Sequence, residues 1–304
     1  MDGIINVYKE SGYTSHDVVA SLRGILHTRK AGHTGTLDPM AEGVLLVCVG
    51  NATKLCDTFG DHDKEYEAVM LLGKTYDTLD VTGVIQETKE VNVSEDEIRD
   101  AVRSFIGGYE QTPPMYSAKK IKGQKLYELA REGIEVERKP VFVRIYDIDI
   151  RDISIPRVTI CVKCGKGTYI RSLIDDIGRK LGCGAAMEKL TRTGVGDFSL
   201  EGAYRLSDIK KMAEENRISD VIITPEDVFA SLESIRLNPG SSKLLRNGNT
   251  LSGDSLGRSG GSQGDKPAVG TRFRMYDDQG VFCGVYEYKA SEDIYKPYKM
   301  FLPG

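Results

Sequence analysis

A short segment near the N-terminus contains residue types that can do chemistry. It reads Gly32-His33-Thr34-Gly35-Thr36-Leu37-Asp38-Pro39. Glycine permits positive φ, and proline restricts the residue before it to extended conformations, so we expect a tight polar loop. A lone carboxylate on such a loop suits nucleophilic or general-base catalysis without a metal or an organic cofactor. The competing interpretation is a turn in which Asp38 only caps the backbone.

Two further segments place polar side chains at the ends of predicted elements. Tyr66 follows Lys64 at the head of a strand, and Tyr169 and Arg171 lie where a strand is followed by a helix. An arginine in reach of Asp38 would keep the carboxylate ionised and oriented, since an opposite charge lowers the pKa of a carboxyl group. The two tyrosine rings can stack on a nucleobase. Half-buried strand aromatics, an exposed arginine at a helix start and a structural histidine at His33 are the competing interpretations.

A run of lysines indicates contacts with phosphate. Residues 117–125 contain Lys119, Lys120, Lys122 and Lys125 and no acidic residue. Such a loop can bind a nucleic-acid backbone, although a solvated charge run is the usual alternative. The net charge of −4 argues against a generally basic surface and leaves room for a local basic groove.

These residues must be positioned by strands and helices that alternate irregularly along the chain. We predict strands over 4–9, 43–50, 66–73, 141–150 and 158–164. We predict helices that open at Ser15 and Ser172, a helix over 126–131, and one that follows a capping box from Ser94 to Glu97 and ends at Gly107. Residues 75–83 are predicted as a turn and 112–117 as an exposed extended segment. Hairpin-compatible neighbouring strands favour an α+β fold with a mixed, largely antiparallel central sheet flanked by helices.

The composition changes near residue 235. Residues 252–266 are rich in glycine and serine, which predicts a flexible loop. Residues 271–276 and 281–288 then alternate like paired strands. We therefore predict two domains, a larger one over 1–234 and a small β-rich one over 235–304.

Composition also excludes several classes of protein. The chain has 304 residues, of which 40% are hydrophobic, and no apolar run reaches the roughly 18 residues of a membrane span. There is no secretory signal, and the six cysteines are scattered, so we expect a cytoplasmic protein with reduced thiols. Cys161 and Cys164 have zinc-ligand spacing, but alternation along a strand would place them on opposite faces. No glycine-rich nucleotide-binding motif occurs at a strand–helix junction.

Taken together, the motifs resemble those of the bacterial tRNA pseudouridine synthase B family. The opening loop with Gly43-Val44-Leu45-Leu46 resembles its catalytic motif, and 64–66 and 167–173 resemble its strand and arginine motifs. Residues 190–193 are similar to the segment that closes its active site, and 112–119 to the start of its RNA-clamping insertion, about 113–143. The β-rich end is similar to a PUA RNA-binding domain.

The resemblance implies isomerisation of uridine 55 in the T-loop of tRNA to pseudouridine, without a cofactor. It implies that Asp38 is the catalytic aspartate, that Tyr66 stacks on the base and that Arg171 pairs with Asp38. Tyr169 and Leu190 would line the pocket, and His33 would fill the place that the flipped base leaves. The RNA backbone would contact five lysines, namely Lys9, Lys64, Lys119, Lys120 and Lys122. The implied partner is the T-arm stem-loop of tRNA, with no membrane and no obligatory protein partner, and the protein is expected to be a monomer.

Three questions stay open at this level. Asp38 can attack C6 of uracil or C1′ of ribose, or can assist loss of a 2′ proton. A non-catalytic RNA-binding or RNA-chaperone protein on the same fold is an alternative, although such a protein would not need Asp38, Tyr66 and Arg171 together. A catalytic subunit of a guide-RNA particle is another, and the insertion at 113–143 favours the stand-alone form over it.

Overall fold

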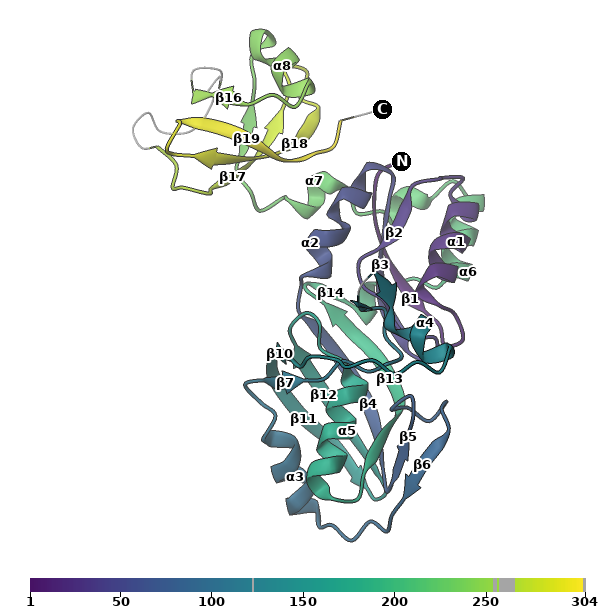
Figure 1. Ribbon diagram of the computed structural model, residues 1–304. Coiled ribbons are helices and arrows are strands. Elements are labelled where there is room, and N and C mark those ends of the chain that lie inside the picture. Colours follow the sequence, from purple (N-terminus) through teal and green to yellow (C-terminus); the bar gives the residue numbers. More distant parts are fainter. Residues whose placement is uncertain (122, 254–255, 257–265, 303–304) are drawn as a thin grey trace.

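The computed structural model describes residues 1–121, 123–253, 256 and 266–302. Within these residues a mixed sheet forms the middle of the larger part of the chain (Figure 1). Its strands run in the order β1-β3-β13-β4-β12-β11, with β2 beside β3 and β14 beside β13. The sheet consists of β1 (Gly3–Lys9), β2 (Ala31–His33), β3 (Glu42–Val49), β4 (Lys64–Leu72), β11 (Ile145–Ser154), β12 (Arg157–Cys164), β13 (Ala185–Val195) and β14 (Phe198–Ser199).

Every pair in this sheet is antiparallel except β3 with β13. The mixed, largely antiparallel sheet that the sequence predicts is therefore confirmed. The alternation of β4 sends Lys64, Tyr66 and Ala68 to the buried face. Tyr66 stands opposite Val162 on one neighbouring strand and opposite Arg192 on the other. This register fixes the position of the tyrosine ring.

Helices cover the sheet and begin and end at recognisable signals. They are α1 (Ser15–Ile25), α2 (Cys56–Gly60), α3 (Glu95–Arg103), α4 (Leu126–Arg131), α5 (Ile170–Leu181), α6 (Leu206–Glu214) and α7 (Pro225–Val228), with short 3-10 turns η1 (Gly50–Leu55), η2 (Leu200–Gly202) and η3 (Ile218–Asp220). The predicted capping box from Ser94 to Glu97 is present at the start of α3. Gly182 ends α5 with a φ of 78°, a left-handed conformation that glycine adopts easily.

Besides the central sheet, the described part of the chain forms three small two-stranded hairpins. They pair β5 (Lys74–Tyr76) with β6 (Ile85–Thr88), β7 (Tyr109–Gln111) with β10 (Val141–Val143), and β8 (Lys120–Ile121) with β9 (Gln124–Lys125). The second hairpin joins the two ends of the segment 112–140. Its ends are thereby anchored close together beside the main sheet.

The C-terminal part forms a second, five-stranded sheet that projects from one end of the molecule (Figure 1). Its order is β15-β17-β18-β19-β16, and its elements are β15 (Ser234–Arg236), α8 (Pro239–Arg246), β16 (Leu251–Ser252), β17 (Arg272–Tyr276), β18 (Phe282–Lys289) and β19 (Ile294–Met300). It has a core of its own, to which Met275, Tyr286 and Tyr295 belong. Lys54 Nζ donates to the Met300 carbonyl at 2.9 Å and links the two parts.

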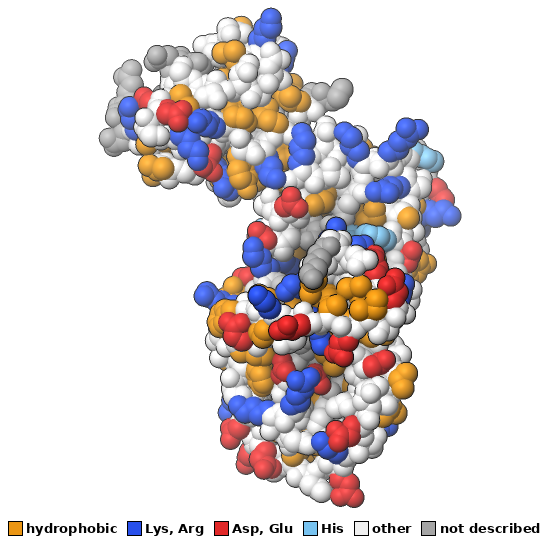
Figure 2. All heavy atoms as spheres, in the orientation of Figure 1, with side chains coloured by type: hydrophobic (Ala, Val, Ile, Leu, Met, Phe, Trp, Pro, Cys, Tyr) orange, Lys and Arg blue, Asp and Glu red, His pale blue; other side chains and the backbone are white. Residues whose placement is uncertain are grey.

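Charged side chains are unevenly distributed over the face drawn in Figure 2. Acidic side chains gather at its lower end, where α3 lies, and the first turn of α3 contains three of them, Glu95, Asp96 and Glu97. Lys and Arg side chains are more numerous over the upper half, up to the C-terminal sheet. The net negative charge of the chain is therefore unevenly distributed over this face.

The structure differs from the sequence-based predictions in five places. Gly32 and His33 belong to β2 rather than to a turn, because they pair with Cys48 and Val47 of β3. The predicted strand 141–150 is divided between two sheets, and the predicted turn 75–83 begins inside a strand. The helix after Ser94 ends at Arg103, before Gly107.

The fifth difference concerns 112–117, which the sequence predicts to be exposed. Pro113, Pro114 and Ser117 are buried. The segment packs on the start of α5, where Ser172 Oγ donates to the Thr112 carbonyl at 3.0 Å. The predicted flexible loop 252–266 lies largely outside the described residues.

Candidate active site

Backbone contacts from neighbouring elements hold the loop that carries Asp38. Ser15, the first residue of α1, accepts a hydrogen bond from Leu37 N at 2.9 Å and donates one to the Leu37 carbonyl at 3.1 Å. Ala41 N donates to the Asp38 carbonyl at 3.1 Å, and Thr34 N donates to the Leu46 carbonyl at 3.1 Å. The sharp turn at Pro39 is thereby fixed from both sides, and Asp38 is held at its tip.

Two buried cationic side chains, Lys9 and Arg192, hold the same loop through hydrogen bonds to its backbone carbonyls and to that of the following strand. Lys9 Nζ donates to the Ala41 carbonyl at 2.5 Å and to the Pro39 carbonyl at 3.2 Å. Arg192 Nε donates to the Val44 carbonyl at 2.7 Å, and its Nη2 donates to the Gly35 carbonyl at 3.2 Å. Sequence analysis did not give Arg192 a role, although it lies in the 190–193 motif.

The side chain of Arg171 reaches Asp38 from the first turn of α5. Its Nε lies 2.9 Å from Asp38 Oδ2. The rest of the guanidinium donates to backbone carbonyls, from Nη1 to Thr78 at 2.9 Å and from Nη2 to Tyr116 at 2.7 Å. The Arg171 side chain is only 5% exposed, so this planar fork is rigidly placed. The pairing that the resemblance implies is therefore present in the structure.

Asp80 is a second carboxylate beside Arg171 that sequence analysis missed. Its Oδ2 lies 3.5 Å from Arg171 Nη1. Its Oδ1 accepts from Thr82 N at 3.0 Å and from Thr78 Oγ1 at 2.9 Å, and the residue is buried. The sequence offered one signal for Asp80, its position in a threonine- and aspartate-rich segment. Such a segment predicts an ordinary turn as well as it predicts a site residue. The contact between Asp80 and Arg171 of α5 becomes visible only in the folded structure.

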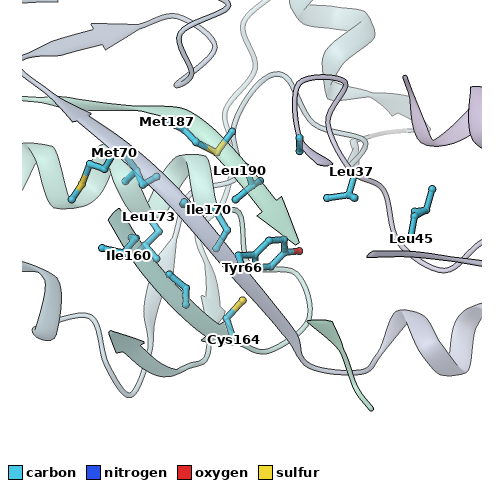
Figure 3. Packing of buried hydrophobic residues seen from close by; sticks show 14 of the residues in the cluster. Leu37, Leu45, Tyr66, Met70, Ile160, Cys164, Ile170, Leu173, Met187 and Leu190 are labelled. Atoms are coloured by element: carbon cyan, nitrogen blue, oxygen red, sulfur yellow. The ribbon is translucent and has the colours of Figure 1, made fainter. Parts of the chain in front are cut away.

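Asp38 and Arg171 form part of the wall of a cavity of about 420 Å³, within the usual range for small-ligand sites. Tyr66, Tyr169 and Leu190 line it as well, so five of the six predicted substrate-site residues meet here. Figure 3 shows Tyr66 pointing from β4 toward the side where Leu37 of the Asp38 loop lies, with Leu190 and Ile170 beside it. The cavity thus combines an ion-paired carboxylate with aromatic and apolar walls.

The environment makes Asp38 more basic than a free carboxylate. Burial raises its pKa, the positive charge of Arg171 opposes this effect, and the negative charge of Asp80 adds to it. Burial also raises the pKa of the Tyr66 and Tyr169 phenols, so both are neutral near pH 7. A carboxylate that is both paired and basic can act as a nucleophile or as a base.

His33 lies near the cavity but does not line it. Its ring is 5.4 Å from that of His16, and burial together with this neighbour lowers its pKa to about 4. Its Nδ1 is buried and makes no hydrogen bond to the described part of the chain. His33 is therefore a neutral imidazole with one unsatisfied ring nitrogen.

The lysines occupy three different environments. Lys9 is fully buried and is held by carbonyl groups, so its Nζ is not exposed to an RNA backbone in the structure described. Lys64 is also buried, and its Nζ donates to Gly60 and His62 carbonyls, but it lines the cavity. Lys119 lines the cavity and Lys120 is exposed. Lys122 lies outside the described residues.

Three further observations concern other kinds of site. Over the described ranges, no group of three or more His, Cys, Asp and Glu side chains is arranged to hold a metal ion. Cys161 and Cys164 differ in burial along β12, as alternation predicts. None of the helices in the described part of the chain is both long enough and apolar enough to cross a membrane.

Comparisons with known proteins identify the class to which this mixed sheet and its arginine–aspartate pair belong, the pseudouridine synthases, and they also specify the family. Residues 23–170 match the family model of the TruB family pseudouridylate synthase N-terminal domain. Residues 171–230 match that of the tRNA pseudouridylate synthase B C-terminal domain. The chain belongs to the tRNA pseudouridine synthase B family.

Individual relatives agree with this assignment. The tRNA pseudouridine synthase B of Lachnoclostridium phytofermentans is 47% identical over 99% of this chain and 100% of its own length. That of Clostridium acetobutylicum is 42% identical over 99% of both chains. Among solved structures, a Cbf5-Nop10-Gar1 complex contains a chain that is 26% identical, with a TM-score of 0.71 over 99% of this chain and 85% of that one.

Proposed function

We propose that this protein converts uridine 55 in the T-loop of tRNA to pseudouridine, with Asp38 as the catalytic carboxylate. The observation that carries the proposal is the pairing of Arg171 Nε with Asp38 Oδ2 at 2.9 Å in the wall of the cavity. The family supports the reaction class, because relatives that match nearly the whole chain are named tRNA pseudouridine synthase B. A non-catalytic RNA-binding protein would have no use for a buried, oriented carboxylate–guanidinium pair.

The chemistry needs only groups that the cavity provides. The N1–C1′ bond of the uridine breaks, the uracil turns, and C5 bonds to C1′ while the C5 proton leaves and N1 regains a proton. This is an isomerisation, so no electron carrier is consumed. Asp38 attacks C6 or C1′, or accepts the 2′ proton, and these routes remain alternatives. Arg171 holds the carboxylate ionised and aimed, since its guanidinium is fixed by two carbonyls.

The target base must leave the RNA stack before it can reach Asp38, which costs a few kcal/mol. Stacking on Tyr66 and apolar contact with Leu190 offset that cost, because both line the cavity. His33, on β2 outside the cavity, is placed to pack where the base left the T-loop. Tyr169 lies beside Asp38 and Arg171 and packs against the sugar side of the nucleotide.

Contacts with the rest of the tRNA would come from basic and β-rich surfaces. Lys119 and Lys120 lie at the mouth of the cavity or beside it, on the predicted RNA-clamping insertion. The C-terminal sheet is proposed as the PUA-like RNA-binding domain, and Lys and Arg side chains are numerous around it in Figure 2. We propose that residues 1–234 form the catalytic domain and that residues 235–304 extend the tRNA footprint.

The protein is proposed to act alone, as a cytoplasmic monomer. Some solved relatives are described as parts of complexes with Nop10 and Gar1, and one as an H/ACA particle bound to a substrate RNA. The segment 113–143 brings Lys119 to the cavity, with the exposed Lys120 next to it in the chain, and these two lysines would hold the RNA. Curated relatives of equal length are named as tRNA enzymes.

Incubation of the purified protein with unmodified tRNA transcripts tests the proposal. Pseudouridine is mapped at nucleotide resolution, with a transcript carrying cytidine at position 55 as the control. We expect pseudouridine at position 55 of the first transcript and at no position of the second. Absence of product with tRNA alone, or product only after a guide RNA or partner protein is added, would contradict the proposed stand-alone activity.

A further inference from the structure

Ser117 has a buried hydroxyl group that pairs with no group of the described residues. Ser117 is 5% exposed, and its Oγ makes no hydrogen bond within the part of the chain that the structure describes. Ser117 nevertheless lines the cavity that Asp38 also lines. An unsatisfied buried hydroxyl costs stability, so its presence in a functional cavity calls for an explanation.

The backbone around Ser117 is fixed on both sides. Ser117 N donates to the Met115 carbonyl at 2.9 Å, and the Ser117 carbonyl accepts from Tyr127 N at 3.1 Å. The carbonyl just before it, that of Tyr116, accepts from Arg171 Nη2 at 2.7 Å. The position of the Ser117 side chain is therefore tied to the same guanidinium that holds Asp38.

Tyr169 is fixed in the same way. The buried side chain of Gln111 accepts from Tyr169 N at 2.8 Å and donates to the Tyr169 carbonyl at 3.0 Å. Burial raises the pKa of the Tyr169 phenol, and the Ser117 hydroxyl opposes that rise. Ser117 and Tyr169 both line the cavity, and no hydrogen bond joins their oxygens in the structure.

We propose that Ser117 is a positioning residue whose Oγ–H donates a hydrogen bond to the Tyr169 phenolic oxygen once a uridine occupies the cavity. The bond fixes the phenol beside the Asp38 carboxylate during the reaction. Hydrogen bonds in unoccupied sites are often long or poorly aligned and tighten in the substrate complex. The proposal rests on the proposed function, because it needs the nucleotide to complete the geometry.

Ser117→Ala separates this role from a structural one. A hydroxyl that only stabilised the fold would lower the melting temperature when removed, whereas an unpartnered one would not. We expect an unchanged or higher melting temperature, an unchanged tRNA affinity and a single-turnover rate about 3- to 10-fold lower than that of the wild type.

Ser242 provides the matched control. It is a buried serine in the C-terminal sheet domain, and its Oγ donates to the Asn238 carbonyl at 3.1 Å and accepts from Asp278 N at 2.8 Å. Ser242→Ala is expected to lower the melting temperature and to leave the single-turnover rate unchanged well below that temperature.

A double-mutant cycle with Tyr169→Phe tests the partner. Because the phenylalanine has no oxygen to accept the hydrogen bond, adding Ser117→Ala in this background should not lower the rate further. A wild-type rate in Ser117→Ala, or the same loss in both backgrounds, would overturn the inference. Failure of the wild type to form pseudouridine would instead overturn the proposed function.

Discussion

The Arg171 guanidinium lies between two carboxylates, with Nε 2.9 Å from Asp38 Oδ2 and Nη1 3.5 Å from Asp80 Oδ2. Asp38 faces the cavity and its side chain is 33% exposed, whereas that of Asp80 is only 6% exposed. One carboxylate is therefore available to a substrate while the other belongs to the support of the arginine. Each of these three side chains can be tested separately.

Replacement of the arginine tests the fork geometry. Arg171→Lys keeps the charge, but a lysine cannot contact Asp38 and both carbonyls in one plane. We expect the single-turnover rate to fall by at least about 100-fold, because a buried ion pair loses its geometry. Arg157→Lys is the matched control, since Arg157 makes a fork with Glu188 at 2.7 and 2.8 Å on the surface. A near-normal rate in Arg171→Lys would remove its proposed role.

Asp80 is expected to act through Arg171 rather than on the substrate. Asp80→Asn removes the charge next to Nη1 and should lower the single-turnover rate about 10- to 100-fold while tRNA affinity stays unchanged. Asp208→Asn, on the exposed face of α6, is the control and should behave like the wild type. Stopped-flow or quench assays under single-turnover conditions provide the rate, and filter binding provides the affinity. An Asp80→Asn variant with full activity would show that Asp38 and the carbonyls suffice to hold the arginine.

His33 predicts how the free energy of unfolding depends on pH. Its pKa in the folded protein is lowered to about 4, chiefly by burial, from 6.5 in an unfolded chain. Between pH 6.5 and about pH 4, His33 is protonated in the unfolded state and neutral in the folded state. The free energy of unfolding therefore falls as the pH is lowered through this window. Relative to His33→Gln, the wild type should lose about 1.5 kcal/mol between pH 6.5 and pH 5. Urea unfolding at both pH values measures this difference, and equal pH dependence of the two proteins would contradict it.

The lysines of the insertion should act on tRNA affinity and not on the chemical step. Each phosphate contact contributes about one unit to the slope of log affinity against log salt concentration. The double variant Lys119→Ala/Lys120→Ala should therefore weaken tRNA binding and reduce that slope by about one to two units. Lys89→Ala removes an exposed lysine near Glu87 and serves as the control. An unchanged slope in the double variant would exclude phosphate contacts by these two side chains.

Most of the fold could be predicted from the sequence, because strong local signals decide it. The alternation of 158–164, the capping box at Ser94 and the glycine at 182 each act within a few residues, and the helix over 126–131 has the predicted bounds. Gly32 and His33 escaped prediction because their hydrogen bonds come from β3, which follows on the other side of the Asp38 loop. The burial of 112–117 likewise depends on contacts with α5.

The site was predictable where a residue type is unusual in its setting. Asp38 among glycines and threonines, and Tyr169 with Arg171 at a strand–helix junction, are such cases. Asp80 and Ser117 are not, since an aspartate in a turn and a serine in an extended segment are ordinary. The burial of Lys9 could not be predicted. A lysine that donates to buried carbonyls and one that binds phosphate look the same in a sequence.

The central claim is that the Asp38 carboxylate performs the isomerisation. The most direct measurement compares wild type and Asp38→Ala on an unmodified tRNA transcript, with pseudouridine at position 55 quantified at single-nucleotide resolution and tRNA affinity measured in parallel. We predict complete conversion by the wild type, and no detectable pseudouridine with nearly unchanged affinity in Asp38→Ala, since the cavity and the RNA-binding surfaces stay intact. Pseudouridine formation by Asp38→Ala at the wild-type rate would contradict the claim.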